Sequence, residues 1–116
     1  MTDETVTLYR PTGPKELALV REAKFKKWPP RLPEQPIFYP VTNRQYAEQI
    51  AHDWNVKHSG VGYVTMFLVK AEFMAKYEIQ LVGGANRAER WIPANDLEEL
   101  NANIVGDIKV IGEFGT

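Results

Sequence analysis

The chain has 116 residues, of which 44% are hydrophobic and 25% charged, a composition typical of one soluble globular domain. The lack of cysteine excludes disulfides, thiolate metal centres and thiol nucleophiles. A net charge of −1 argues against a dedicated nucleic-acid or membrane binder, and no apolar run approaches the roughly 20 residues of a membrane span. Because the N-terminus lacks the basic start of a signal peptide, we expect a single cytoplasmic domain over residues 1–116.

The first forty residues predict a strand, a helix and a stiff connection. Residues 5–10 are β-branched and aromatic, which favours a strand. Pro14 suits the first position of a helix, which has to end before Pro29. Five of the eight prolines fall within residues 28–40, so we expect an extended connection there, with a short strand over residues 37–39.

The clearest amphipathic helix is predicted over residues 42–56. Thr42 and Gln45 have the spacing of a capping box, and the helix should end by Gly60. Its apolar positions recur at helical intervals, so three large side chains should be buried against a sheet: Tyr46, Ile50 and Trp54. The next run, residues 61–69, is apolar on both alternating faces, which is typical of a central strand covered on both sides.

The last forty residues predict short strands and one helix. Residues 77–82 and 88–92 should pair as a hairpin around a glycine-rich turn. Asn95 or Asp96 would cap the short helix that follows, and residues 104–114 predict a last strand. Strands with intermittent short helices and hairpin-length links predict an α+β fold with two small, mostly antiparallel sheets.

Basic residues gather in one part of the chain. Residues 14–32 contain six lysines and arginines but only two acids. Lys24, Lys27 and Arg31 could assist the binding of a phosphate, whereas a solvated helix face accounts for the same pattern without any ligand. The sequence leaves both interpretations open.

General motifs of catalysis are absent from the sequence, which has no P-loop, dinucleotide fingerprint, zinc-protease helix or nucleophile elbow. The segment Gly60–Gly62 precedes a strand rather than a helix, so its glycines predict packing and not phosphate binding. The two histidines, His52 and His58, lack a third ligand at a suitable spacing. We therefore expect no metal site.

Two charged residues stand out because they lie on otherwise apolar elements. Arg10 closes the first predicted strand, and Glu89 begins the run Glu-Arg-Trp-Ile-Pro. A charge on a buried element is costly unless a partner or a solvated cleft compensates it. Either the two residues serve a cleft, or they are charges at the edge or surface of a sheet.

Several segments resemble a small bacterial family labelled "ADP-ribosylation/crystallin J1", and through it the ADP-ribosyltransferase fold; they are residues 8–11, 13–17, 38–40, 91–97 and 103–106. In transferases of that fold an Arg or His ends the first strand, and a later short strand can carry a Tyr. A Glu then begins a strand that ends in Pro. Arg10, Tyr39 and Glu89 stand in this order here.

The resemblance implies an ADP-ribosyltransferase-like domain whose substrate is NAD and whose partners are a small-molecule nucleotide and a protein acceptor. Arg10 and Tyr39 would bind NAD, Glu89 would be the catalytic residue, and the three should converge on one cleft. Arg87 departs from the pattern, because transferases often carry Gln or Glu two residues before the catalytic Glu. The motif Ser-Thr-Ser does not occur either.

Three functions stay open at this point. The first is an enzyme that transfers or processes ADP-ribose, and the second is a non-catalytic binding module on the same fold. The third is unrelated chemistry, such as that of a nuclease-like toxin or its inhibitor. The sequence does not decide whether the chain is an enzyme.

Overall fold

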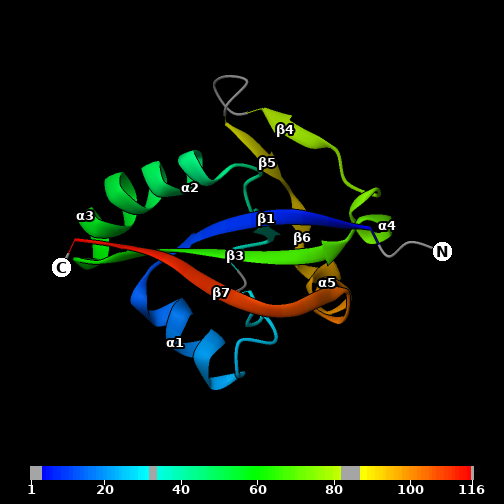
Figure 1. Cartoon of the computed structure of the whole chain (residues 1–116), viewed down its shortest axis with the longest axis horizontal. Coiled ribbons are helices and arrows are strands. Elements are labelled where there is room, and N and C mark those ends of the chain that lie inside the picture. The colour runs from blue at the N-terminus through cyan, green and yellow to red at the C-terminus, as the bar shows by residue number, and fades with distance from the viewer. Residues whose placement is uncertain (1–3, 32–33, 82–86, 116) are drawn as a thin grey trace.

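A three-stranded antiparallel sheet in the order β1-β3-β7 forms the centre of the computed structural model, which describes residues 4–31, 34–81 and 87–115 (Figure 1). The strands are β1 (Thr5–Thr12), β3 (Gly62–Lys70) and β7 (Ile104–Phe114). β3 lies in the middle and is apolar on both faces, which confirms the predicted central strand.

Two short strand pairs accompany this sheet in the described part of the chain. β2 (Ile37–Phe38) pairs with β6 (Ile92–Pro93), and β4 (Ile79–Leu81) pairs with β5 (Ala88–Arg90), both antiparallel. Isolated bridges link Tyr9 to Val41 and Val41 to Glu89, so a single residue connects β1 with β5. The turn predicted between β4 and β5 lies outside the described residues, while the α+β class with small antiparallel sheets is confirmed.

The helices are short and lie on both sides of the central sheet, with α2 and α3 opposite α1 (Figure 1). They are α1 (Pro14–Glu22), α2 (Arg44–Ile50), the π-helix η1 (Ala51–Asn55), α3 (Val56–Ser59), α4 (Ala71–Met74), the 3-10 helix η2 (Ala94–Asp96) and α5 (Leu97–Ala102). Within the described part of the chain, no helix is long and apolar enough to cross a membrane.

Because helices cover both faces of the sheet, the protein has two hydrophobic cores. The larger core, between the sheet and α1, α4 and α5, consists of Leu8, Val20, Trp28, Phe38, Phe67, Val69, Phe73, Met74, Ile92, Leu97, Leu100 and Ile108. The smaller core lies under α2 and η1 and consists of Val41, Ala47, Ala51 and Val64. The alternation of strand residues places Leu8 in the larger core and leaves Tyr9 to pack against the smaller one.

The prediction that Trp54 is buried is wrong, because η1 widens the helix there. A π-turn accommodates one more residue than an α-turn, which shifts every later position around the axis. Asn55 consequently packs close to Gly62 on the sheet, while Trp54 is 60% exposed and stacks on His58 with ring centroids 3.9 Å apart. Tyr46 and Ile50 are partly buried against the smaller core.

The capping prediction for α2 is off by one residue. Asn43, rather than Thr42, is the N-cap, and its side-chain oxygen accepts a hydrogen bond from the backbone N–H of Tyr46 at 2.7 Å. The backbone N–H of Thr42 donates instead to the carbonyl of Ala88 on β5, at 3.0 Å. This contact ties the start of α2 to the strand that carries Glu89.

Candidate functional site

Glu89 lies on β5 with its side chain directed toward α2, and it is buried. Its two carboxylate oxygens have different partners: the Tyr46 hydroxyl donates to Oε2 at 2.6 Å, and the Trp91 indole N–H donates to Oε1 at 2.9 Å. Trp91 directly follows β5, two residues after Glu89, which brings its indole within reach of the carboxylate. Glu89 is thus held by neutral donors, and no cation of the described residues lies within ion-pair distance of it.

Tyr46 is fixed from both ends. Its backbone N–H is bound by the Asn43 cap, and its hydroxyl by Glu89. Burial, and secondly the hydrogen bond to Glu89, raise the pKa of Tyr46 to about 12. The phenol therefore keeps its proton at neutral pH and remains a donor to the carboxylate.

Arg10 lies in a second cluster, on the side of the larger core. Its guanidinium donates two hydrogen bonds to Glu16 on α1, at 2.5 and 2.9 Å, in the forked geometry that arginine and carboxylate favour. The group also lies over the Phe38 ring, 4.6 Å from its centroid, and its side chain is 9% exposed. Arg10 is therefore a paired, buried cation.

Arg31 joins this second cluster. Its Nη1 lies 3.8 Å from the same Glu16 carboxylate, and its side chain is only 8% exposed. Burial lowers the pKa of Arg31, the Arg10 guanidinium lowers it further, and Glu16 and Tyr39 act in the opposite direction. Two buried guanidinium groups thus share one carboxylate.

Tyr39 lies between the two clusters. Its ring centroid is 5.8 Å from Arg10 Cζ, and the ring is 46% exposed. Electrostatic interaction with its hydroxyl acts to raise the pKa of Arg31 and also the pKa of Tyr46. Tyr39 is consequently the predicted site residue that lies near Arg10 and also acts on Tyr46, the partner of Glu89.

The structure brings Tyr39 to Arg10, whereas Glu89 belongs to the other cluster. Tyr9 is opposite Val41, and Val41 is opposite Glu89, so the side chains of Tyr9 and Glu89 share one face of the sheet. Arg10, the neighbour of Tyr9, points to the other face. The predicted convergence on one cleft is replaced by two clusters that meet near Tyr39.

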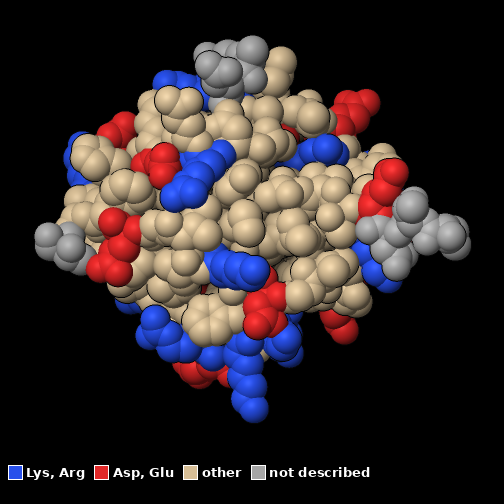
Figure 2. All heavy atoms as spheres, in the orientation of Figure 1, with Lys and Arg blue, Asp and Glu red and all other residues tan. Residues whose placement is uncertain are grey.

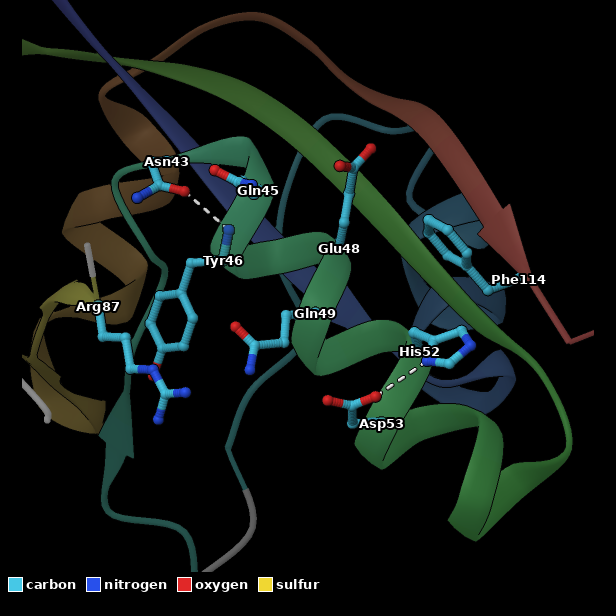
Figure 3. Close-up of a pocket in the computed structure, with 9 residues that line it drawn as sticks. All are labelled: Asn43, Gln45, Tyr46, Glu48, Gln49, His52, Asp53, Arg87 and Phe114. Carbon is cyan, nitrogen blue, oxygen red and sulfur yellow. Dashed lines mark hydrogen bonds and ion pairs between the residues drawn. The ribbon is translucent and has the colours of Figure 1, made fainter. Parts of the chain in front are cut away.

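Each cluster borders a groove. The first groove, of about 600 Å³, contains Tyr46 and Arg87 at one end and reaches along α2 to His52 and Phe114 (Figure 3). The second, of about 980 Å³, lies between the segment after α1 and the helix α5, with Trp28 and Arg31 in its wall. Figure 2 shows Lys and Arg side chains gathered at the edge of the molecule where α1 lies, interspersed with acids.

Sequence reasoning missed the partners of both predicted charges. Helical periodicity predicts Tyr46 only as a core residue, and no sequence pattern pairs Trp91 with Glu89 or Glu16 with Arg10. The one local signal compatible with a contact is the short separation of Glu89 and Trp91, two residues along the chain. The described residues contain no group of three His, Asp or Glu side chains that could hold a metal ion.

Comparison with known proteins provides no relative, because no family model, no curated protein and no solved structure matches the chain.

Proposed function

We propose that the chain binds the nicotinamide riboside part of NAD beside Glu89, as an ADP-ribosyltransferase-like protein would. The observation that supports this is a buried carboxylate in contact with the indole of Trp91, whose side chain is 45% exposed, while the exposed ring of Tyr39 lies near Arg10. The nicotinamide ring of NAD is a planar cation. Such a group is attracted both by aromatic faces and by a carboxylate that has no counter-ion.

The arrangement of Glu89 also suits the chemistry of nicotinamide release. Breaking the bond between nicotinamide and ribose builds oxocarbenium character on the sugar, which a nearby carboxylate stabilises. Tyr46 and Trp91 each donate one hydrogen bond to Glu89. An ionised carboxylate has about four acceptor positions, so two are left for a ribose hydroxyl.

The Arg10–Glu16 pair favours a second candidate, a non-catalytic binding module on the same fold. An arginine that is already bound twice by a carboxylate has to leave that partner before it can hold a pyrophosphate. If Arg10 does not bind the pyrophosphate, the Glu89 cluster recognises a cationic ring but does not position the rest of a dinucleotide. In this case NAD is bound weakly and is not cleaved.

The test combines binding and turnover for the wild type, Glu89→Gln and, as a control, Glu72→Gln, which changes an exposed acid on α4. Calorimetry and two-dimensional NMR follow the binding of NAD, and nicotinamide release follows turnover. We expect NAD to shift the Trp91 indole signal. Glu89→Gln should lower the release rate by roughly 10²–10³ and weaken NAD binding by a much smaller factor, because the carboxylate attracts the cationic ring in the bound state but acts most strongly on the charge of the transition state.

Charge recognition is tested separately with two small rings. The cation 1-methylnicotinamide should bind more tightly than neutral nicotinamide, and Glu89→Gln should remove the difference. Binding of NAD at Trp91 without release would establish the second candidate. If the wild type binds neither NAD nor 1-methylnicotinamide at millimolar concentration, both candidates are wrong.

A further inference from the structure

The cluster around Arg10 and Arg31 has an uncompensated positive charge. Both side chains are more than nine-tenths buried, and the carboxylate that they share is Glu16. Arg10 takes the two short hydrogen bonds, so Arg31 is left with an ion pair of 3.8 Å. A buried charge that lacks a full partner is costly, and proteins retain one chiefly where something else compensates it.

Two buried donors in the same region have no hydrogen-bond partner in the described part of the chain. They are the Arg31 Nε–H and the Trp28 Nε1–H. Most buried N–H groups in proteins are paired, and an exception often marks the place of a water molecule or an ion. Both residues line the groove of about 980 Å³ beside α5, so an acceptor that enters this groove is close to them.

We propose that this groove, between the segment 26–31 and α5, binds a phosphate-bearing small molecule whose anionic group pairs with Arg31. A phosphate has several acceptor oxygens and suits the forked donors of arginine. The exposed Lys27 lies in the same wall and has no ion-pair partner among the described residues, so it adds a second cation at the mouth.

The rest of the lining indicates the kind of molecule that carries the phosphate. Lys26 is paired with Asp107, and the acids Glu22 and Glu98 are exposed, so solvent and salt screen their charges. Proline, alanine and leucine side chains provide apolar walls: Leu19, Ala23, Pro29, Pro30, Ala94, Leu97 and Ala102. The volume and these walls fit an anionic head attached to a small organic body, such as a nucleoside diphosphate.

The test uses inorganic pyrophosphate, ADP and adenosine as probes, with calorimetry for affinity and NMR for position. We expect pyrophosphate and ADP to bind, with shifts at the Trp28 indole and the Arg31 backbone, and adenosine to bind far more weakly. Pyrophosphate contains neither nicotinamide nor ribose, so its binding is independent of the NAD site proposed at Glu89. Failure of one proposal therefore leaves the other standing.

Arg31→Gln should weaken pyrophosphate binding by about tenfold or more, the scale of one charge-assisted contact. The matched control is Arg21→Gln, which removes an exposed arginine from the last turn of α1 and should leave binding unchanged. Arg31→Gln should also keep or raise the Tm of the free protein, because it removes a poorly compensated buried cation. If Arg31 served only as a partner of Glu16, its replacement would lower the Tm.

Arg31→Lys provides a second variant if Arg31→Gln does not fold, since it keeps the charge but loses the forked donors of the guanidinium. We expect its affinity for pyrophosphate to lie between those of the wild type and Arg31→Gln. The proposal is overturned if pyrophosphate binds Arg31→Gln as tightly as the wild type. It is also overturned if the shifts lie only at exposed lysines away from Trp28, or if the wild type does not bind pyrophosphate or ADP at millimolar concentration.

Discussion

Two carboxylates of this protein, the partly buried Glu16 and the buried Glu89, are stabilised in opposite ways. Glu16 is bound by guanidinium groups, whereas Glu89 is bound by a phenol and an indole. Neutral donors leave the negative charge of Glu89 without a counter-ion, whereas arginine is in excess around Glu16; the proposed binding of a cationic ring and of a phosphate rests on these features. The chemistry of each cluster therefore follows from its partners and not from the residue type alone.

The titration of Tyr46 tests this description of Glu89. Because the folded-state pKa is about 12, above the ordinary value of 10.0, the interaction stabilises the fold below about pH 10 and is lost as the pH rises toward 12. Glu89→Gln should lower the pKa of Tyr46 only part of the way, since burial is the larger cause. The measurement is the tyrosinate absorbance or NMR signal of Tyr46 during an alkaline titration.

Tyr77 is an internal control for that titration. Burial and its hydrogen bond to Asp96 also raise its pKa, and Glu89 is not among the causes. In Glu89→Gln the late titration of Tyr77 should therefore be unchanged, and Tyr46→Phe identifies the Tyr46 transition by removing it. An unchanged Tyr46 transition in Glu89→Gln would show that the hydrogen bond does not hold in solution.

At the scale of elements, the helix that runs from α2 through α3 contains one residue more than an α-helix making the same number of turns, because its η1 segment is a π-turn. Ala51 and Asn55 both face the sheet, as residues four apart also do in an α-helix, whereas the wider π-turn η1 rotates Trp54 away from the sheet; His52 and Trp54 are exposed. Deletion of an exposed residue within η1 should restore an α-helix without moving the contacts on either side.

Deletion of Asp53 tests this interpretation. Asn55 and Val56 then take the α-helical positions three and four residues after Ala51, so they keep facing the sheet. We expect a folded protein with a Tm close to that of the wild type and with Trp54 still accessible to a fluorescence quencher.

Deletion of Glu48 is the matched control, because that residue lies in the regular helix α2. It turns Tyr46 by about 100° relative to Ala51 and so separates it from Glu89. The Tm should fall, and the pKa of Tyr46 should return toward 10. If the two deletions lower the Tm equally, the π-turn is not an added residue but a required part of the packing.

At the scale of the whole molecule, the helix layer and the sheet lie in close contact at Gly62. A Cβ built on this residue would lie 2.5 Å from the Ala51 carbonyl oxygen and 2.7 Å from the Asn55 Cβ, and the first of these contacts is with backbone. The prediction that this glycine serves packing is thereby confirmed. Its small size lets η1 lie directly on β3 above the smaller core.

Gly62→Ala should lower the free energy of unfolding by about 1–3 kcal/mol, the usual cost of overpacking, because backbone cannot move aside as a side chain can. The comparison is Gly112→Ala on β7, where a new Cβ would make only ordinary contacts, the shortest 3.4 Å from Phe114. Urea unfolding of both variants measures the difference. Equal free energies of unfolding would contradict the close approach of η1 to the sheet.

The strands and helices that could be predicted correctly are those whose sequence patterns involve only neighbouring residues. The alternation in residues 61–69, the proline at position 14 and the last strand from Ile104 to Phe114 each depend on neighbours a few positions away, and all three agree with the structure. The end of the long helix at Gly60 follows from the same kind of signal, since this glycine adopts the left-handed conformation with φ of 81°.

Only the tertiary structure decided which side chains meet. Val41 pairs with both Tyr9 and Glu89, and these long-range bridges place Arg10 and Glu89 on opposite faces of the sheet. The contact between Tyr46 and Glu89 joins residues 43 positions apart. Periodicity predicts which face of an element is apolar, but the identity of the element that covers that face depends on pairing over the whole chain. For this reason Arg10 and Glu89 could be singled out from the sequence as charges on apolar elements, and their division between two clusters on opposite faces of the sheet could not.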